Sequence, residues 1–99
     1  MPFRIEYSPA AEDHLRVLTA RQRTTVFDAV DRQLAHQPNM ETRNRKPMRP
    51  NPIAPWELRI GTLRVYYDIE EEPASRVIVL AVGKKIRNRV FLGDEEVEL

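Results

Sequence analysis

The sequence predicts a single α+β domain in which a helical hairpin packs on one face of a small, mostly antiparallel sheet. Apolar residues recur at helical spacing between residues 9 and 37, and they alternate with polar residues between residues 56 and 69. The chain has 99 residues, 41% of them hydrophobic, which is enough for one compact core but not for two. We therefore predict one domain over residues 1–99 with the element order β-α-α-β-β-β.

The first part of the chain contains a strand and both helices. Residues 3–7 alternate apolar and charged side chains, as a half-buried strand does. Ser8 and Pro9 are typical of an N-cap and a first helical turn, so a helix is predicted over residues 9–18. A second helix over residues 20–37 follows a tight link and ends before Pro38, which predicts an antiparallel hairpin. Its apolar stripe consists of Val26, Phe27, Ala29, Val30 and Leu34.

Residues 38–55 hold five of the eight prolines. Neither a helix nor a central strand accommodates prolines at this spacing. These residues are therefore predicted to form a long basic loop without regular secondary structure. Loops of such length in small domains are often functional or disordered.

Three strands are predicted after this loop. Residues 56–60 and 63–69 alternate apolar and polar side chains, and Gly61-Thr62 between them fits a two-residue hairpin turn. Residues 77–82 are continuously apolar, as in a strand covered on both faces. Gly83 ends this strand, and a basic run over residues 84–89 follows. The apolar side chains of the hairpin face the helices, and its other face carries Glu57, Arg59, Arg64, Tyr66 and Asp68.

The charges are distributed unevenly along the chain, although the formal net charge is only +1. Residues 43–66 and 84–93 together carry +9, and the other residues carry −8. Arginine outnumbers lysine thirteen to three, and the planar guanidinium group suits phosphate recognition. The near-neutral total therefore conceals a basic surface that is suited to a nucleic acid.

Arg59 and Arg64 flank the predicted hairpin turn, so they are expected to lie directly opposite each other on one face of the sheet. Like charges in this arrangement destabilise a sheet, and an anionic ligand between them would relieve the repulsion. The alternative is that Glu57 and Asp68 neutralise both arginines in a solvated ladder. The basic run over residues 84–89 enlarges the same patch and favours the ligand.

A surface of arginine, lysine and Tyr66 suits single-stranded RNA, which requires phosphate contacts and base stacking. No metal or cofactor is expected, because the chain has no cysteine and the acidic residues of 68–72 resemble a solvated turn. His14 and His36 are expected at the surface of the helices. Cleavage of RNA would therefore depend on cations that stabilise a pentavalent phosphate, with the RNA 2′-hydroxyl as nucleophile. No apolar run is long enough to span a bilayer, and we expect a cytoplasmic protein.

Two segments resemble the RelE/ParE superfamily of toxins from type II toxin–antitoxin systems, and they are closer to its RelE-like branch. They are WELRIGTLRVYYDI at residues 56–69 and VLAVGKK at residues 79–85. The predicted element order also agrees with this superfamily. RelE-like members are messenger-RNA endonucleases that act in the ribosomal A site. The resemblance therefore implies a metal-independent mRNA interferase that inhibits translation, with the ribosome, messenger RNA and a cognate antitoxin as partners.

The resemblance also assigns roles to individual residues. Catalytic roles fall to Arg59, Arg64 and Lys85, with Arg64 at the scissile phosphate. RNA contacts are expected from Arg45, Lys46, Arg49, Tyr66, Lys84, Arg87, Arg89 and Phe91. The chain departs from a well-studied branch at two positions, where Glu57 replaces a lysine and Phe91 replaces a tyrosine. Phenylalanine can stack on a base but cannot transfer a proton.

Two other functions are compatible with this scaffold, because a fold does not by itself define a function. ParE-like members bind DNA gyrase and lack the nuclease residues, and a nuclease-inactive relative would bind only its antitoxin. The presence of Arg59, Arg64 and Lys85 favours the nuclease. Either class of toxin implies an antitoxin whose acidic or amphipathic segment covers the basic face and folds on binding.

Overall fold

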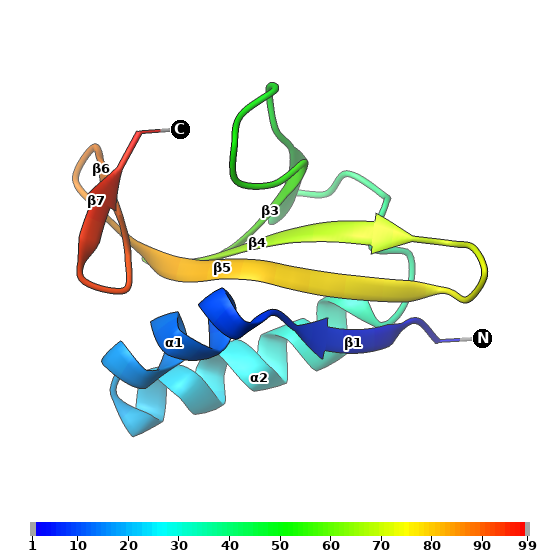
Figure 1. Cartoon of the computed structure of the whole chain (residues 1–99), viewed down its shortest axis with the longest axis horizontal. Helices are drawn as coiled ribbons and strands as arrows, with labels where there is room; N and C mark the ends of the chain where they lie inside the picture. Colours follow the sequence, from blue (N-terminus) through cyan, green and yellow to red (C-terminus); the bar gives the residue numbers. More distant parts are fainter. Residues whose placement is uncertain (1, 99) are drawn as a thin grey trace.

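A computed structural model describes residues 2–98 and shows two helices on one side of a twisted sheet (Figure 1). The order of elements is β1 (Arg4–Tyr7), α1 (Pro9–Val17), α2 (Ala20–Leu34), β2 (Arg45–Pro47), β3 (Trp56–Ile60), β4 (Leu63–Glu70), β5 (Arg76–Ile86), β6 (Arg89–Leu92) and β7 (Glu95–Val97). The predicted α+β class, with a helical hairpin on a sheet, is confirmed.

The seven strands form one sheet, in which β2 to β7 are neighbours in chain order and β1 pairs with β5. The β1–β5 pair is parallel and every other pair is antiparallel. Gly61 and Thr62 join β3 to β4, and Ile60 pairs with Leu63 across this turn. The predicted hairpin and the mostly antiparallel sheet are therefore confirmed.

Local capping signals explain where the helices begin and end. Ser8 is the N-cap of α1 and its hydroxyl accepts a hydrogen bond from the Ala11 N–H. Thr19 and Gln22 form a reciprocal capping box at the start of α2, which makes the link between the helices very short. Helix α2 ends at Leu34, before the predicted residue 37, because the chain turns sharply there and Gln37 takes a positive φ of 52°.

The main core lies between the helices and the inner face of the sheet, by which we mean the face toward the helices. It is formed by Ala11, Leu15, Leu18, Val26, Val30, Leu34, Leu58, Leu63, Val65, Tyr67, Val77, Val79 and Val82. The apolar stripe predicted for α2 is confirmed at Val26, Ala29, Val30 and Leu34. Phe27 was wrongly included, because its side chain is 40% exposed. It lies at the margin of the core and makes an edge-to-face contact with Tyr7.

The sequence missed three short strands. Arg45–Pro47 lies in the predicted loop and pairs with β3, while the last part of the chain forms the β6–β7 hairpin. These strands have three or four residues each. They are too short for an alternating pattern to reveal them, because their formation depends on the edge that the longer strands offer.

A second apolar cluster covers the outer face of the sheet, which is opposite the helices. It is centred on Ala54, Tyr66, Ala81 and Leu92, with Met48, Ile53, Leu80, Val90 and Val97 packed around them. The loop before β3 and the β6–β7 hairpin supply most of this cover. The outer face is therefore partly enclosed by segments that lie on either side of β4 and β5.

Gly83 of β5 allows β6 to cross the outer face closely. A Cβ atom at this position would lie 2.0 Å from the Phe91 carbonyl oxygen and 2.9 Å from Leu92 Cδ2. The backbone of β6 cannot move away without losing the pairing of residues 83–86 with β6. Only glycine therefore fits here.

His14 completes an open edge of β5. Strand β1 pairs with residues 76–79 of β5 and β6 pairs with residues 83–86, which leaves the edge between them uncovered. The Ser8 hydroxyl donates to the Leu80 carbonyl at 3.1 Å, and the Val82 N–H donates to His14 Nδ1 at 3.2 Å. His14 lies on helix α1 and is half-buried, and its hydrogen bond to β5 gives it a structural role that the sequence did not predict. Burial lowers the pKa of His14, although the negative charges of Asp13 and Glu95 act in the opposite direction and raise it.

We expect Gly83→Ala to destabilise the fold strongly, because the methyl group would overlap the Phe91 carbonyl. The loss in the free energy of unfolding should reach about 3 kcal/mol or more, the upper end for overpacking, and urea denaturation would measure it. Gly61→Asn is the matched control, since nothing lies within 4 Å of a Cβ at Gly61 and asparagine tolerates its φ of +59°. Equal losses in the two variants would contradict this account.

We also expect the free energy of unfolding to fall as the pH decreases below about 6.5, the usual pKa of histidine. His14 Nδ1 must be unprotonated to accept the hydrogen bond from Val82, so its pKa is lower in the folded state. This contribution is complete above the unfolded-state pKa and is lost as the pH falls through the folded-state pKa. Urea denaturation at several pH values between about 7 and 5 would measure it. His14→Asn keeps an acceptor that does not titrate, so the same slope in this variant would refute the assignment.

Candidate nucleic-acid interface

The turn end of the β3–β4 hairpin presents charged side chains on the outer face. Register and alternation place Glu57 and Arg59 of β3 on this face, opposite Tyr66 and Arg64 of β4 respectively. Two neighbouring cross-strand pairs on this face thus bring together one acid, two arginines and one tyrosine. The predicted juxtaposition of Arg59 and Arg64 is confirmed by this register.

Glu57 lies between the two arginines. Its Oε1 atom is 2.8 Å from Arg59 Nε, and its Oε2 atom is 4.0 Å from Arg64 Nε. The Glu57 side chain is only 12% exposed, whereas that of Arg59 is 48% exposed. Neutralisation of the arginine pair by Glu57, which was the alternative to a bound anion, therefore occurs in the free protein. Asp68, the other acid considered for this role, forms no ion pair with a side chain of residues 2–98.

Arg64 is held more tightly than Arg59. Its Nη1 atom donates to the carbonyl oxygens of Gly61 at 2.7 Å and of Leu63 at 2.9 Å, and its side chain is 12% exposed. The turn therefore fixes one end of the guanidinium group, while Arg64 Nε lies toward Glu57. A positioned cation of this kind can stabilise a phosphate at little cost in side-chain entropy.

Strand β5 continues to Ile86, so the prediction that Gly83 ends it is wrong, and the basic residues that follow Gly83 within the strand point to both faces of the sheet. Lys85 follows Gly83 by two residues, so it lies on the outer face with Arg64. Lys84 pairs with Phe91 on the opposite face. The predicted patch therefore retains Lys85 beside Arg64, but Lys84 and Phe91 belong to a separate surface.

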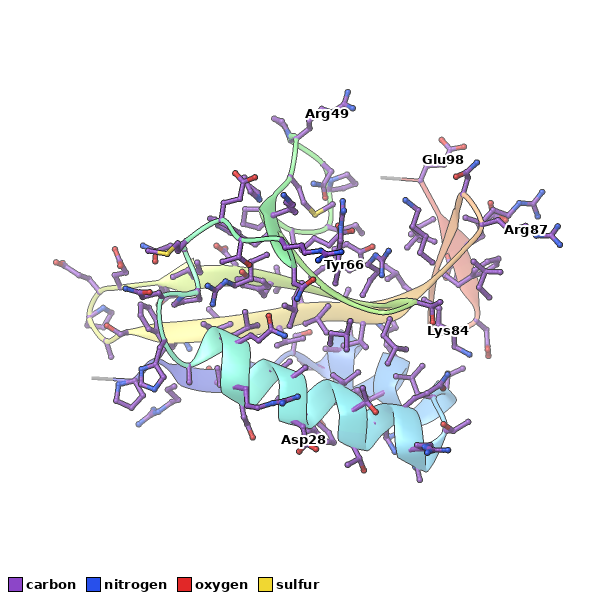
Figure 2. All side chains as sticks on the ribbon, turned by 180° about the vertical axis from the view of Figure 1, so that it is seen from behind. Asp28, Arg49, Tyr66, Lys84, Arg87 and Glu98 are labelled. Atoms are coloured by element: carbon purple, nitrogen blue, oxygen red, sulfur yellow. The ribbon has the colours of Figure 1, made fainter. Side chains whose placement is uncertain are left out.

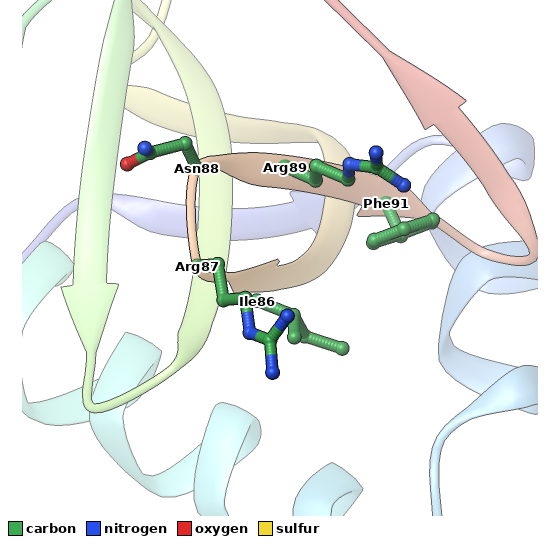
Figure 3. A pocket seen from close by; sticks show the side chains of 5 residues that line it. All are labelled: Ile86, Arg87, Asn88, Arg89 and Phe91. Carbon is green, nitrogen blue, oxygen red and sulfur yellow. The ribbon is translucent and has the colours of Figure 1, made fainter.

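That second surface surrounds the tip of the β5–β6 hairpin. A shallow pocket of about 520 Å³ is lined by Ile86, Arg87, Asn88, Arg89 and Phe91 (Figure 3). Arg87 projects from the far end of the molecule in Figure 2. The tip thus combines two apolar side chains with two guanidinium groups, a combination that suits a stacked base and its phosphates.

Tyr66 lies on the predicted face but is completely buried. Its exposed fraction is 0%, because the loop before β3 and the β6–β7 hairpin pack over it. The expectation that Tyr66 is available for base stacking is therefore wrong for this conformation. The sequence shows only that Tyr66 points away from the helices, and not that a distant loop covers it.

The three basic residues of the loop have different surroundings. The Arg45 guanidinium donates to the carbonyl oxygens of Gln33, Met40 and His36 at and beyond the end of α2, so it stabilises the turn that follows the helix. Lys46 Nζ lies 3.3 Å from Glu41 Oε2. Arg49 stands at the outer end of the loop and projects into solvent (Figure 2). Of the three, Arg49 is the most accessible to a nucleic acid.

Asn51 organises the loop that covers Tyr66, and sequence reasoning missed it. Its amide nitrogen donates to the Arg49 and Ala54 carbonyl oxygens at 2.7 and 2.9 Å. Its amide oxygen accepts from the backbone N–H groups of Ile53 and Ala54. The sequence does contain a hint of this role, because Asn51 lies between prolines and asparagine side chains commonly bond the nearby backbone in turns.

The chemistry of this interface is that of fixed cations. No group of three or more acidic or histidine side chains within residues 2–98 is arranged to hold a metal ion. Burial in the main core and the second cluster raises the pKa of Tyr67 and of Tyr66 respectively. Neither tyrosine is therefore suited to donate or accept a proton at neutral pH.

Neither of the two helices is long and apolar enough to cross a membrane.

Comparisons with known proteins agree with this fold. No model of a protein family matches the chain, and no curated protein does. Among solved structures, the chain is similar to the toxin–antitoxin complex RelBE2 from Mycobacterium tuberculosis. The TM-score is 0.73 with 26% sequence identity, and the match covers 85% of this chain and 92% of the other.

The shared architecture is that of a RelE-like protein, with two helices on an antiparallel sheet. The match extends over most of the chain and supports a place for this chain in the RelE-like toxin superfamily. The resemblance found in residues 56–69 and 79–85 is thereby confirmed at the level of the superfamily.

We expect Asn51→Ala to loosen the loop over Tyr66, because four hydrogen bonds to the backbone are lost. The free energy of unfolding should fall by about 1–3 kcal/mol, and the Ile53 and Ala54 amides should exchange faster in hydrogen-exchange NMR. Asn88→Ala at the exposed hairpin tip is the control and should change neither. Unchanged exchange at Ile53 and Ala54 would disprove the proposed role of Asn51.

Proposed function

We propose that the chain is the toxin of a type II toxin–antitoxin system and cleaves messenger RNA on the ribosome without a metal ion. The observation that carries this proposal is the arginine pair of the outer face, with Arg64 fixed by the hairpin turn and Lys85 on the same face. The likeness to a toxin–antitoxin complex supports a toxin with a cognate antitoxin. The ribosome and messenger RNA are added by the proposal.

The side chains of the outer face can stabilise the negative charge that develops on the phosphate during cleavage. Attack by the 2′-hydroxyl on the adjacent phosphorus places an additional negative charge on the non-bridging oxygens, and Arg64 with Arg59 and Lys85 would stabilise it. The 2′-oxygen forms a bond to phosphorus and loses its proton to water, while the bond to the 5′-oxygen breaks and that oxygen takes up a proton from water. The products are then a 2′,3′-cyclic phosphate and a 5′-hydroxyl.

The hairpin tip gives the RNA a second place to bind. Phe91 and Ile86 offer apolar surface beside Arg87 and Arg89, on a different face from Arg64. Contacts there would increase affinity for RNA without touching the reacting phosphate. The proposed roles are therefore cleavage at the arginine pair and attachment at the tip.

The antitoxin must neutralise the basic surfaces to inhibit such a toxin. An acidic segment that folds across the outer face would pair with Arg59 and with Arg49, both of which are exposed. This complementarity is the reason to expect an acidic partner.

We expect cleavage of translated messages when the chain is produced without its antitoxin, and a loss of cleavage of about 100-fold or more in Arg64→Ala. Mapping of transcript 5′ ends with and without a translation inhibitor would measure it. Because Arg64 also binds the turn carbonyls, Arg64→Lys and a circular dichroism spectrum distinguish lost chemistry from lost folding. Arg32→Ala, on the exposed side of α2, is the matched control and should cleave normally.

Two outcomes would overturn the proposal. Cleavage that is the same in Arg64→Ala and Arg64→Lys as in the unaltered chain would remove the arginine pair from the reaction. Inhibition of gyrase supercoiling by the purified chain, without any cleavage of messages, would assign it to the ParE-like class instead.

A further inference from the structure

The hydroxyl group of Tyr66 is buried without a partner. The side chain is 0% exposed, and its oxygen atom makes no hydrogen bond within residues 2–98. Buried polar groups are almost always paired, because an unpaired one loses its hydration without compensation. A phenylalanine would fill the same apolar cluster without this cost. The hydroxyl group therefore calls for an explanation beyond packing.

Glu57 is the neighbour that this hydroxyl faces across the sheet. The two residues are directly paired in the β3–β4 register, and the Glu57 charge is close enough to contribute to the raised pKa of Tyr66, after burial. The carboxylate lies near enough to the hydroxyl to raise its pKa by charge and by hydrogen-bond contact, but the two groups form no hydrogen bond of good geometry, and the carboxylate is held by Arg59 at 2.8 Å and approaches Arg64 at 4.0 Å. The raised pKa keeps the Tyr66 hydroxyl protonated at neutral pH, so this hydroxyl can donate a hydrogen bond.

A phosphate at the arginine pair would leave Glu57 without its present partners. It would take the guanidinium N–H groups that Glu57 now contacts, and its own charge would repel the carboxylate. Glu57 is only 12% exposed, so water cannot fully replace the lost contacts. Lys46 lies across the register from Glu57 on the other side, but its ammonium group is already paired with Glu41.

We propose that Glu57 exchanges partners when an RNA phosphate binds: it leaves the arginines and accepts a hydrogen bond from the Tyr66 hydroxyl. In the free protein Glu57 occupies the place of the phosphate and neutralises Arg59 and Arg64. In the bound state Tyr66 receives the displaced carboxylate and keeps it away from the anion. Tyr66 is therefore a positioning residue that acts through Glu57. The exchange rests on the proposed function in one respect: the anion that binds the arginines is taken to be a phosphate of RNA.

A double-mutant cycle tests the exchange. The probe is a short single-stranded 2′-O-methyl RNA, which cannot be cleaved, and binding is followed by fluorescence anisotropy. Tyr66→Phe should weaken binding by about tenfold or more, as expected for one hydrogen bond to a charged group. In the Glu57→Gln background the same change should alter affinity by less than about twofold, because no charged carboxylate has to be displaced. Tyr67→Phe is the matched control, since its hydroxyl bonds the Pro38 carbonyl on the inner face.

Stability in the absence of RNA gives an independent readout. Tyr66→Phe should be at least as resistant to urea as the unaltered chain, because the free state gains nothing from the hydroxyl. A less stable variant would show that the hydroxyl is already bonded in the free protein, and this would overturn the exchange. Equal weakening of RNA binding in both Glu57 backgrounds, or no weakening in either, would overturn it as well.

Inorganic phosphate separates this inference from the proposed function. If the RNA does not bind, or binds equally well to Arg64→Ala, the RNA nuclease proposal fails. The exchange is then decided by titrating phosphate into ¹⁵N-labelled protein and following the Arg59 Nε–H resonance. A shift of this resonance that needs more phosphate in Tyr66→Phe supports the exchange, and the absence of any shift overturns it.

Discussion

The hydrogen bonding of strand β5 on both of its edges is the constraint on which the rest of the structure depends. One edge pairs with β4 from Leu63 to Glu70, and the other is divided among β1, the side chains of Ser8 and His14, and β6. Its inner-face valines hold both helices, while Ala81 and Gly83 are small enough for the loop and β6 to approach the outer face. A single strand therefore positions the core and the walls of the candidate interface.

The electrostatics of the outer face follow from one acid among several cations. Arg59 and Arg64 would repel each other without Glu57, so the acid stabilises the free hairpin. The same acid competes with any phosphate that approaches the pair. In the free protein the outer face is therefore closer to neutral than its arginines alone indicate. The buried Tyr66 hydroxyl offers a hydrogen bond to the Glu57 carboxylate when a phosphate displaces it.

The periodicity of the sequence predicted the long elements correctly, because long elements bury a continuous face and must carry the corresponding pattern. The helices, the β3–β4 hairpin and β5 are of this kind. Arg59 and Arg64 could be placed opposite each other because a two-residue turn fixes the register. Strands β2, β6 and β7 could not be predicted, since strands of three or four residues depend on an existing sheet edge rather than on their own pattern.

The sequence by itself determined the α+β class, the resemblance to the RelE-like toxin superfamily and the arginine pair, all of which depend on local spacing. Only the tertiary structure decided which side chains are accessible. It buried Tyr66 beneath a loop anchored by Asn51, committed Arg45 to the end of α2, and divided Lys84 from Lys85 between two faces. Accessibility depends on contacts between segments far apart in the chain, and no pattern within one segment contains them.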